Sequence, residues 1–274
     1  MTVEEAIQQA EAGDVVTMLD LGNYYSKKHD YVKAIKWYQK ASDTGNLFGT
    51  LRTAYCNEYI MRLLMLQKNW DLSIGIFKDL VNQINILHQN PDFLEKEYLE
   101  SLRTEPDNES TYGAEASKLY LAAYLHNIEC NHMLSRYDYV IDKTEGIKDI
   151  DADLLVVRAL ALRDSVPDCA PIDDHIEASY KCFDILDKII PTGYAVRDFY
   201  LDQICCAEAV FFYVSSLATG WNRNDKKNID KAYKILTMWY ERLTDKDAKA
   251  ILSEQLSHFH TKKGLFGTSI AYSK

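Results

Sequence analysis

Residues 15–46, VVTMLDLGNYYSKKHDYVKAIKWYQKASDTGN, decide the fold because they encode two short amphipathic helices joined by a turn. In the first helix, apolar or small side chains recur at intervals of three and four residues, the spacing of one helical face, at Met18, Leu21, Gly22 and Tyr25. The second helix repeats this spacing at Ala34, Tyr38 and Ala41. A lone hairpin of this size buries one face at most, so the stretch predicts that further helices pack against it.

The ends of the two helices are also marked in the sequence. Residues 27–30, KKHD, are polar and as short as a turn between antiparallel helices requires. Gly45 follows the last apolar position by four residues and suits the left-handed backbone conformation that ends many helices. Gly22 and Ala34 are small enough to let the helices approach closely, with tyrosines beside them. Together these residues predict a tight helical hairpin.

The hairpin resembles the tetratricopeptide pattern, here Met18-x2-Leu21-Gly22-x2-Tyr25 followed by Ala34-x3-Tyr38, and is most similar to the Sel-one-like branch of that superfamily. Two positions depart from the family: Met18 stands where a larger residue is preferred, and Asn46 stands where a tetratricopeptide unit has proline. The clear match covers roughly an eighth of the chain. The resemblance implies an all-α fold in which about ten helices, in antiparallel pairs, stack into a right-handed superhelix.

Weaker copies of the unit follow along the chain. After a displacement of 39 residues, Ser73, Phe77 and Leu80 take the places of Ala34, Tyr38 and Ala41. Residues 136–141 resemble the start of a third unit, and residues 228–236 repeat the second helix, with Ala232 matching Ala34. Helices are also predicted at 2–12, 48–67, 90–102, 112–134, 151–163, 175–189, 195–218 and 245–262.

These units predict a single elongated helical-repeat domain over residues 1–274. The segment 164–174, DSVPDCAPIDD, carries two prolines and is the predicted hinge between 1–163 and 175–274. A polar loop is predicted at 103–111, RTEPDNEST. We expect the C-terminal tail, GLFGTSIAYSK, to dock as an apolar strip on the last helix.

The composition excludes several classes of function. Only 11 Gly and 5 Pro occur in 274 residues, which argues against a fold of many short strands. The formal net charge of −10 argues against nucleic-acid binding, which needs a concentrated cationic face. No run approaches the ~18 apolar residues that a membrane span needs. We therefore expect neither nucleic acid nor a membrane among the partners.

The N-terminal residues and the cysteines predict a cytoplasmic location. The stretch MTVEEAIQQAEAGD is acidic and amphipathic, unlike the charged and then apolar layout of a secretory signal. Six cysteines are irregularly spaced and lie mostly on predicted helices among apolar neighbours: Cys56, Cys130, Cys169, Cys182, Cys205 and Cys206. This pattern favours reduced, buried thiols over a disulfide framework.

No spacing in the chain predicts catalysis, a cofactor or a metal. The densest group of metal-ligating residue types is His126, Glu129, Cys130 and His132. Glu129 and His132 have the spacing of a di-iron ligand pair, but that chemistry needs a second pair, and the chain has no other Glu-x-x-His. Phosphate-binding glycine loops and the Gly-x-Ser-x-Gly and His-Glu-x-x-His motifs are absent from the sequence. We therefore predict no catalytic, cofactor-binding or metal-binding residue.

The remaining candidate site is the concave surface that stacked hairpins create. In tetratricopeptide-like proteins the first helix of each pair lines a groove that takes peptides or partner helices. The resemblance assigns six residues of this chain to that groove, four from the first unit and two from the second: Leu19, Asn23, Ser26, Lys27, Glu58 and Arg62. Asn23 matches a position that holds a peptide in some family members, but the family's full carboxylate-clamp set is absent.

The sequence thus predicts a protein-interaction scaffold or adaptor that binds a peptide or helix of another protein and catalyses no reaction. Two alternatives remain open at this point. One is a peptide-sensing regulatory protein, and the other is a helical metal- or thiol-dependent enzyme. Nothing in the sequence assigns an oligomeric state.

Overall fold

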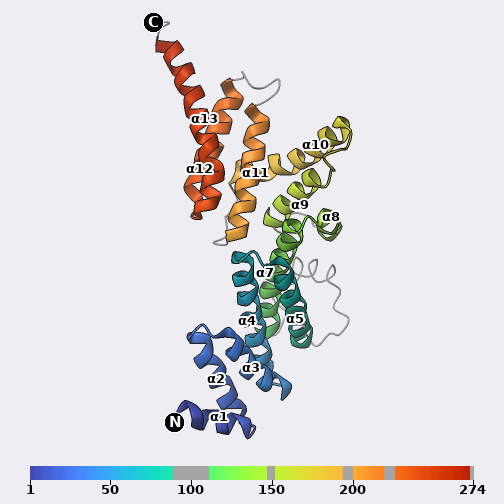
Figure 1. The fold of residues 1–274 in the computed structure, drawn as a ribbon, viewed down its shortest axis with the longest axis vertical. Helices are drawn as coiled ribbons and strands as arrows, with labels where there is room; N and C mark the ends of the chain where they lie inside the picture. Colours follow the sequence, from blue (N-terminus) through green and yellow to red (C-terminus); the bar gives the residue numbers. More distant parts are fainter. Residues whose placement is uncertain (89–110, 147–151, 194–199, 219–225, 272–274) are drawn as a thin grey trace. The chain divides into compact units, whose positions relative to one another are not determined.

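The computed structural model describes residues 1–88, 111–146, 152–193, 200–218 and 226–271 (Figure 1). Within these ranges it contains twelve α-helices, one short 3-10 helix and no strand, so the predicted all-α class is confirmed, with more than the ten or so helices expected. The helix predicted at 90–102 lies outside the described residues. So does the loop predicted at 103–111, except for Thr111, which begins a helix.

The helices have the following bounds. In the first half of the chain they are α1 (Val3–Glu11), α2 (Val15–Lys27), α3 (Tyr31–Asp43), α4 (Leu47–Leu66), α5 (Trp70–His88) and α7 (Thr111–Met133). In the second half they are α8 (Tyr137–Thr144), α9 (Ala152–Asp164), α10 (Ile172–Ile189), the 3-10 helix η1 (Ile190–Thr192), α11 (Tyr200–Ala218), α12 (Lys226–Arg242) and α13 (Lys246–Ala271).

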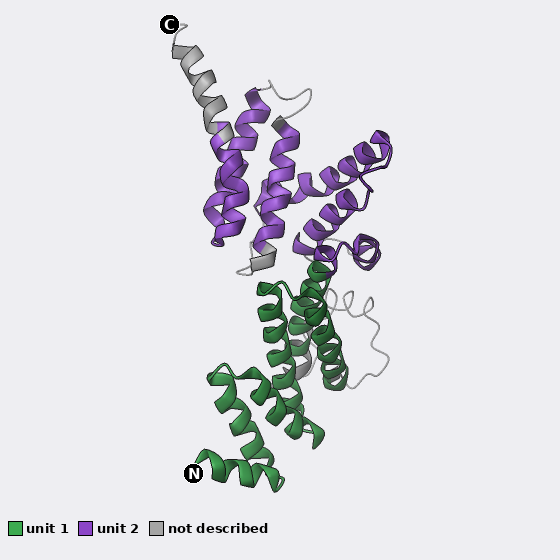
Figure 2. Cartoon of the chain, in the orientation of Figure 1, with its two compact units in different colours: residues 1–130 green, residues 131–274 purple. Residues whose placement is uncertain are grey.

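The chain forms two compact units, residues 1–130 and 131–274, coloured separately in Figure 2. The boundary between them falls inside α7. The predicted hinge segment 164–174 lies within the second unit, where it joins α9 to α10, and these two helices pack against each other.

In unit 1, each helix from α1 to α5 packs against the next one along the chain. The hairpin of α2 and α3 has the predicted core, with Ala34 and Ala41 fully buried and Tyr38 only 2% exposed. Helix α1 covers the end of this hairpin, since Ala6 and Ala10 form one cluster with Met18 and Leu21. The predicted second copy is buried in the same way, at Ser73, Phe77 and Leu80.

The turns that end these helices share one geometry. In each turn a residue with positive φ is followed by a residue whose N–H donates to the carbonyl five positions earlier, which is the Schellman ending of a helix. Gly45 has φ +85°, as predicted, and the N–H of Asn46 donates to the Ala41 carbonyl at 3.3 Å. The same pattern occurs with a non-glycine residue in the positive-φ position at His29, Lys68 and Ser135.

The turn after α4 allows a stability test of this geometry. Lys68 has φ 60°, a conformation in which its Cβ crowds the following carbonyl. We expect Lys68→Gly to raise the free energy of unfolding by about 0.5–1 kcal/mol. The matched control, Lys78→Gly in the exposed middle of α5, should lower it by about 1 kcal/mol. Urea denaturation followed by circular dichroism measures both values, and a destabilised Lys68→Gly protein would contradict the turn geometry.

In unit 2, each helix from α8 to α13 also packs against the next one along the chain. Helix α11 makes additional contacts with α9 and α13, which are not its neighbours in the sequence. Helix α11 is buried around much of its circumference, as its apolar sequence predicts: Cys205, Cys206, Ala207, Ala209, Val210, Tyr213, Val214 and Leu217. In α12 the predicted match Ala232 is fully buried, together with Leu236 and Trp239. Helix α13 continues to Ala271. The residues from about 263 to 271 therefore belong to this helix, and the prediction that they form a separate strip docked on it is wrong.

Candidate peptide-binding groove

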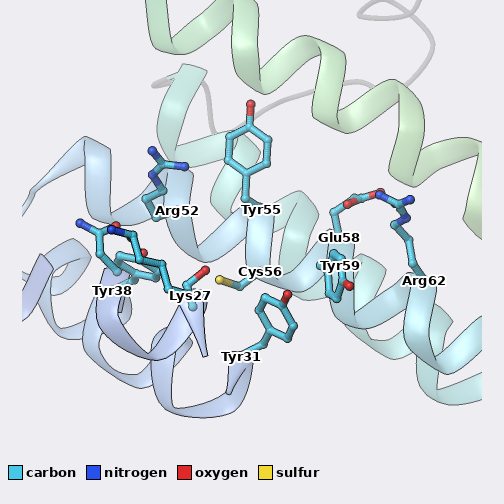
Figure 3. A pocket seen from close by; sticks show the side chains of 11 residues that line it. Lys27, Tyr31, Tyr38, Arg52, Tyr55, Cys56, Glu58, Tyr59 and Arg62 are labelled. Carbon is cyan, nitrogen blue, oxygen red and sulfur yellow. Dashed lines mark hydrogen bonds and ion pairs between the residues drawn. The ribbon is translucent and has the colours of Figure 1, made fainter. Parts of the chain in front are cut away.

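A groove with a volume of about 510 Å³ lies among α2, α3 and α4 in unit 1 (Figure 3). Helix α2 contributes Asn23, Ser26 and Lys27, and α3 contributes Tyr31 and Tyr38. Helix α4 contributes the largest share: Arg52, Tyr55, Cys56, Glu58, Tyr59 and Arg62. All eleven residues belong to described parts of one compact unit.

Helical periodicity explains why these side chains gather. On α4, the lining residues Arg52, Tyr55, Cys56, Tyr59 and Arg62 are spaced by three or four residues, so they form one stripe along the helix, as Figure 3 shows. On α2, Asn23 is followed at three and four positions by Ser26 and Lys27. The short turn before Tyr31 brings the start of α3 to the same groove.

Five of the six residues that the sequence assigns to the groove do line it: Asn23, Ser26, Lys27, Glu58 and Arg62. The sixth, Leu19, is partly buried and packs against the clusters that hold α1, α2 and α3 together. Asn23 also has an internal role, because its Oδ1 accepts a hydrogen bond of 2.8 Å from the Tyr38 hydroxyl. The amide oxygen of Asn23 is therefore already engaged within the hairpin.

Six lining residues were not predicted from the sequence: Tyr31, Tyr38, Tyr55, Tyr59, Arg52 and Cys56. The i, i+3, i+7 and i+10 spacing from Arg52 was the available signal for the α4 residues. The rings of Tyr31 and Tyr59 contact each other, with centroids 4.4 Å apart, although they come from different helices. No periodicity within one helix predicts such a pair.

Each arginine of the groove lies against an aromatic ring. The guanidinium of Arg52 is 4.9 Å from the ring centroid of Phe48 and 5.9 Å from that of Tyr55. The guanidinium of Arg62 is 5.8 Å from the centroid of Tyr59. Contacts of this kind attract a cation to the face of the ring and help to fix the position of its side chain.

Among the lining residues that the structure describes, Glu58 is the one carboxylate. Its Oε1 lies 3.8 Å from Arg62 Nε and 3.6 Å from Nε2 of His126, a buried residue of α7. The three cations Lys27, Arg52 and Arg62 therefore outnumber the carboxylates of the lining by two. Glu115 of α7 lies close by, since the Tyr55 hydroxyl donates to its Oε2 at 3.2 Å.

Three tyrosines and the cysteine of the groove have raised pKa values. Burial raises the pKa of both Tyr31 and Tyr38 to about 12, and burial together with Glu115 raises the pKa of Tyr55. Burial also raises the pKa of the Cys56 thiol to about 11. The phenols of Tyr31, Tyr38 and Tyr55 can therefore act as ring surfaces and neutral hydrogen-bonding groups, and Cys56 is a poor nucleophile.

The candidate metal ligands on α7 do not converge on one point. His126 lies between Glu58 and Glu129, with its Nδ1 3.2 Å from Glu129 Oε2. His132 lies in unit 2 instead, where its Nε2 is 3.3 Å from Asp164 Oδ2 without hydrogen-bonding geometry. In the described parts of the chain, no group of three or more His, Cys, Asp and Glu side chains is arranged to hold a metal ion.

Unit 2 contains a partly buried cluster in which two carboxyls have opposite pKa shifts. Burial raises the pKa of Glu208, although His132 and Arg163 act in the opposite direction. Burial also disfavours ionisation of Asp164, but His132 and Arg163 more than offset it and hold the pKa of Asp164 below its ordinary value. Arg163 Nη2 donates to Asp164 Oδ2 at 2.9 Å.

We expect Glu208→Gln to make the protein more stable than the unaltered chain at neutral pH. When the pKa of a carboxyl is raised in the folded state, the free energy of unfolding falls as the pH rises through that pKa, because the fold disfavours the ionised form. The amide of glutamine does not ionise, so the variant does not lose stability in this way. Below about pH 4 the carboxyl is protonated in both states, so the difference should vanish. Urea denaturation between pH 4 and pH 8 measures the effect.

Asp164→Asn provides the control, because the lowered pKa of Asp164 stabilises the fold at neutral pH and that contribution is lost as the pH falls. This variant should be less stable than the unaltered chain at pH 7, with a difference that shrinks on acidification. Equal behaviour of the two variants would contradict the described cluster.

Comparisons of the chain with protein-family models, with curated proteins and with solved structures found no match. Among the helices that the structure describes, none is long and apolar enough to cross a membrane.

Proposed function

We propose that this protein is an interaction scaffold or adaptor, which binds a peptide or helix of another protein in the groove of α2, α3 and α4 and catalyses no reaction. One observation carries the proposal: five residues chosen from the sequence as groove positions lie around one groove in the structure. Apart from Cys56, the added lining consists of four tyrosines and Arg52, residue types that are enriched in the binding surfaces of proteins.

The proposal includes a tetratricopeptide-like, Sel-one-like arrangement in which antiparallel helix pairs continue as a right-handed superhelix, and a cytoplasmic location. Two features support the helix pairs. The core positions of α2–α3 recur in α4–α5 after 39 residues, and the turns after α2 and α4 share the same helix ending. The five buried cysteines are free thiols, as expected of a reducing compartment.

The test is a selection of random displayed peptides on the full-length chain, followed by binding measurements with enriched peptides. We expect the double variant Lys27→Glu/Arg52→Glu to bind these peptides at least about tenfold more weakly, because it reverses two charges of the lining. Both residues are exposed, so the fold should be unaffected. The matched control Lys78→Glu reverses an exposed charge on α5, outside the groove, and should bind normally.

Equal affinity for the unaltered and double-variant proteins would show that the peptides bind elsewhere and would refute the groove as the site. Failure to enrich any peptide would count against the scaffold function itself.

A further inference from the structure

Helix α10 of unit 2, labelled in Figure 1, has two apolar faces. Its buried face, where α10 packs against α9, η1 and α11, holds four residues: Ala178, Cys182, Leu186 and Ile189. Its exposed face carries Ile172, Ile176 and Tyr180, which are 71%, 47% and 68% exposed. These three side chains follow one another at intervals of four residues, so they form one stripe along the helix. A contiguous exposed stripe, unlike a single exposed side chain, is typical of an interaction surface.

Carboxylates border this apolar stripe. Asp173, Glu177 and Asp184 are exposed and are separated by four and seven residues, so they lie on one line along α10. At about 100° per residue, Asp173 and Asp184 lie within about 40° of Tyr180 around the helix axis. The exposed face of α10 therefore combines an apolar stripe with an acidic edge.

Two carboxylates of the acidic edge are available to a ligand. In the described part of the chain, the side chains of Asp173 and Asp184 form no hydrogen bond or ion pair. Glu177 is engaged locally, because its Oε1 lies 2.7 Å from Lys181 Nζ. A ligand cation that reaches Asp173 or Asp184 therefore has no cation of the described chain to displace.

The charge of α10 as a whole is negative. With His175 counted as neutral, the helix contains two cations, Lys181 and Lys188, and five carboxylates: Asp173, Asp174, Glu177, Asp184 and Asp187. Asp187 is also close to a cation of α12, since its Oδ1 lies 3.8 Å from Lys231 Nζ. The chain itself has a formal net charge of −10, so a cationic ligand is attracted to this face and an anionic one is repelled.

We propose that the exposed face of α10 docks a helix of a partner protein whose apolar stripe is bordered by lysine or arginine residues. The apolar side chains of that helix pack on Ile172, Ile176 and Tyr180, and its cations pair with Asp173 and Asp184. Ile172 to Asp184 spans about 18 Å, so the contact takes about three turns of each helix. None of these residues lines the groove of α2, α3 and α4, so this docking surface is independent of the function proposed for that groove.

The first test uses the full-length chain and synthetic helical peptides of about 15 residues, labelled for fluorescence anisotropy. One peptide presents leucines at every third or fourth position with lysines beside them. A second replaces each lysine with glutamate, and a third has the composition of the first in an order that gives no apolar stripe. We expect the basic peptide to bind at least about tenfold more tightly than either of the others, and added salt to weaken its binding.

The double variant Ile172→Ser/Tyr180→Ala removes the two most exposed side chains of the stripe. It should bind the basic peptide at least about tenfold more weakly, because large side chains at the centre of a contact carry much of its affinity. Val16→Ser/Val32→Ser is the matched control, since these valines are equally exposed on α2 and α3. The control should bind normally, and thermal unfolding of each variant checks that the fold is retained.

The double variant Asp173→Asn/Asp184→Asn keeps the shape of the acidic edge and removes its two available charges. It should bind the basic peptide about three- to tenfold more weakly and with a smaller dependence on salt. Asp20→Asn/Asp79→Asn neutralises two exposed carboxylates of unit 1 and controls for the change in net charge. This control should bind within about twofold of the unaltered chain.

Equal binding of the basic and acidic peptides, or normal binding by Ile172→Ser/Tyr180→Ala, would overturn the proposal, as would the absence of measurable binding. Sedimentation equilibrium tests a different occupant: a dimer that Ile172→Ser/Tyr180→Ala dissociates would show that a second copy of the chain covers the stripe instead. The groove variant Lys27→Glu/Arg52→Glu separates the two proposals, because it should bind the basic peptide normally while losing the ligands of the groove. Loss of the basic peptide with that variant would place the peptide in the groove and not on α10.

Discussion

Replacing Gly49 with alanine should lower the free energy of unfolding by about 1–3 kcal/mol, although alanine is the better helix former. A Cβ at position 49 would lie 2.9 Å from the Ser42 nitrogen, the Tyr38 carbonyl oxygen and the Ala41 Cβ. Two of these are backbone atoms of α3, which cannot rotate away as the end of a side chain can. The first turn of α4 must therefore move away from α3.

Gly75 on α5 is the matched control for Gly49. A Cβ at position 75 would meet no atom within 4 Å, and the residue is exposed within a helix. Gly75→Ala should therefore raise the free energy of unfolding by about 0.5–1 kcal/mol, through reduced backbone entropy of the unfolded chain. Urea denaturation of both variants gives the two values. If Gly49→Ala were as stable as Gly75→Ala, the close approach of α3 and α4 would be refuted.

Truncation of Trp239 to alanine should destabilise unit 2 by about 3–5 kcal/mol. This residue is fully buried on α12, and its Nε1–H donates to the Ile190 carbonyl at 3.1 Å. Alanine would leave a large cavity and would remove one of the two hydrogen bonds that the Ile190 carbonyl accepts, the other being donated by the Gly193 N–H at 3.3 Å. Trp239→Phe removes the hydrogen bond but keeps most of the volume, so its cost should be smaller.

Tyr180→Ala on α10 serves as the control for Trp239, because Tyr180 is 68% exposed. We expect a change within about 0.5 kcal/mol. Far-ultraviolet circular dichroism during urea denaturation follows all three variants without depending on tryptophan fluorescence. Similar losses for Trp239→Ala and Tyr180→Ala would mean that Trp239 is not an interior residue.

The local structure of unit 1 could be predicted because it depends on residues near one another in the chain. Asn46 caps α4 by accepting a hydrogen bond of 2.9 Å from the Gly49 N–H, three residues away. Gly45 ends α3 through its own backbone conformation. Apolar spacing gave the faces of α2 and α3, since a helix brings every third and fourth residue together.

The groove could be predicted only in part, for a geometric reason. The 39-residue displacement relates Leu19 and Asn23 to Glu58 and Arg62, which placed both helices in one groove. The displacement could not show that the Leu19 side chain packs inward, because the burial of Leu19 depends on where α1 and α3 cross α2. The contact of Tyr31 with Tyr59 likewise depends on the placement of two helices.

By itself, the sequence determined the helical class, the ends of the helices in the first hairpin and the residues of the recurring core, because short-range spacing and capping control them. Tertiary structure alone decided that α11 packs against α9 and that a glycine at position 49 is required by the α3 backbone. It also decided that three cations and four tyrosines surround one groove. Such features arise from contacts between helices whose distance and crossing no local pattern encodes.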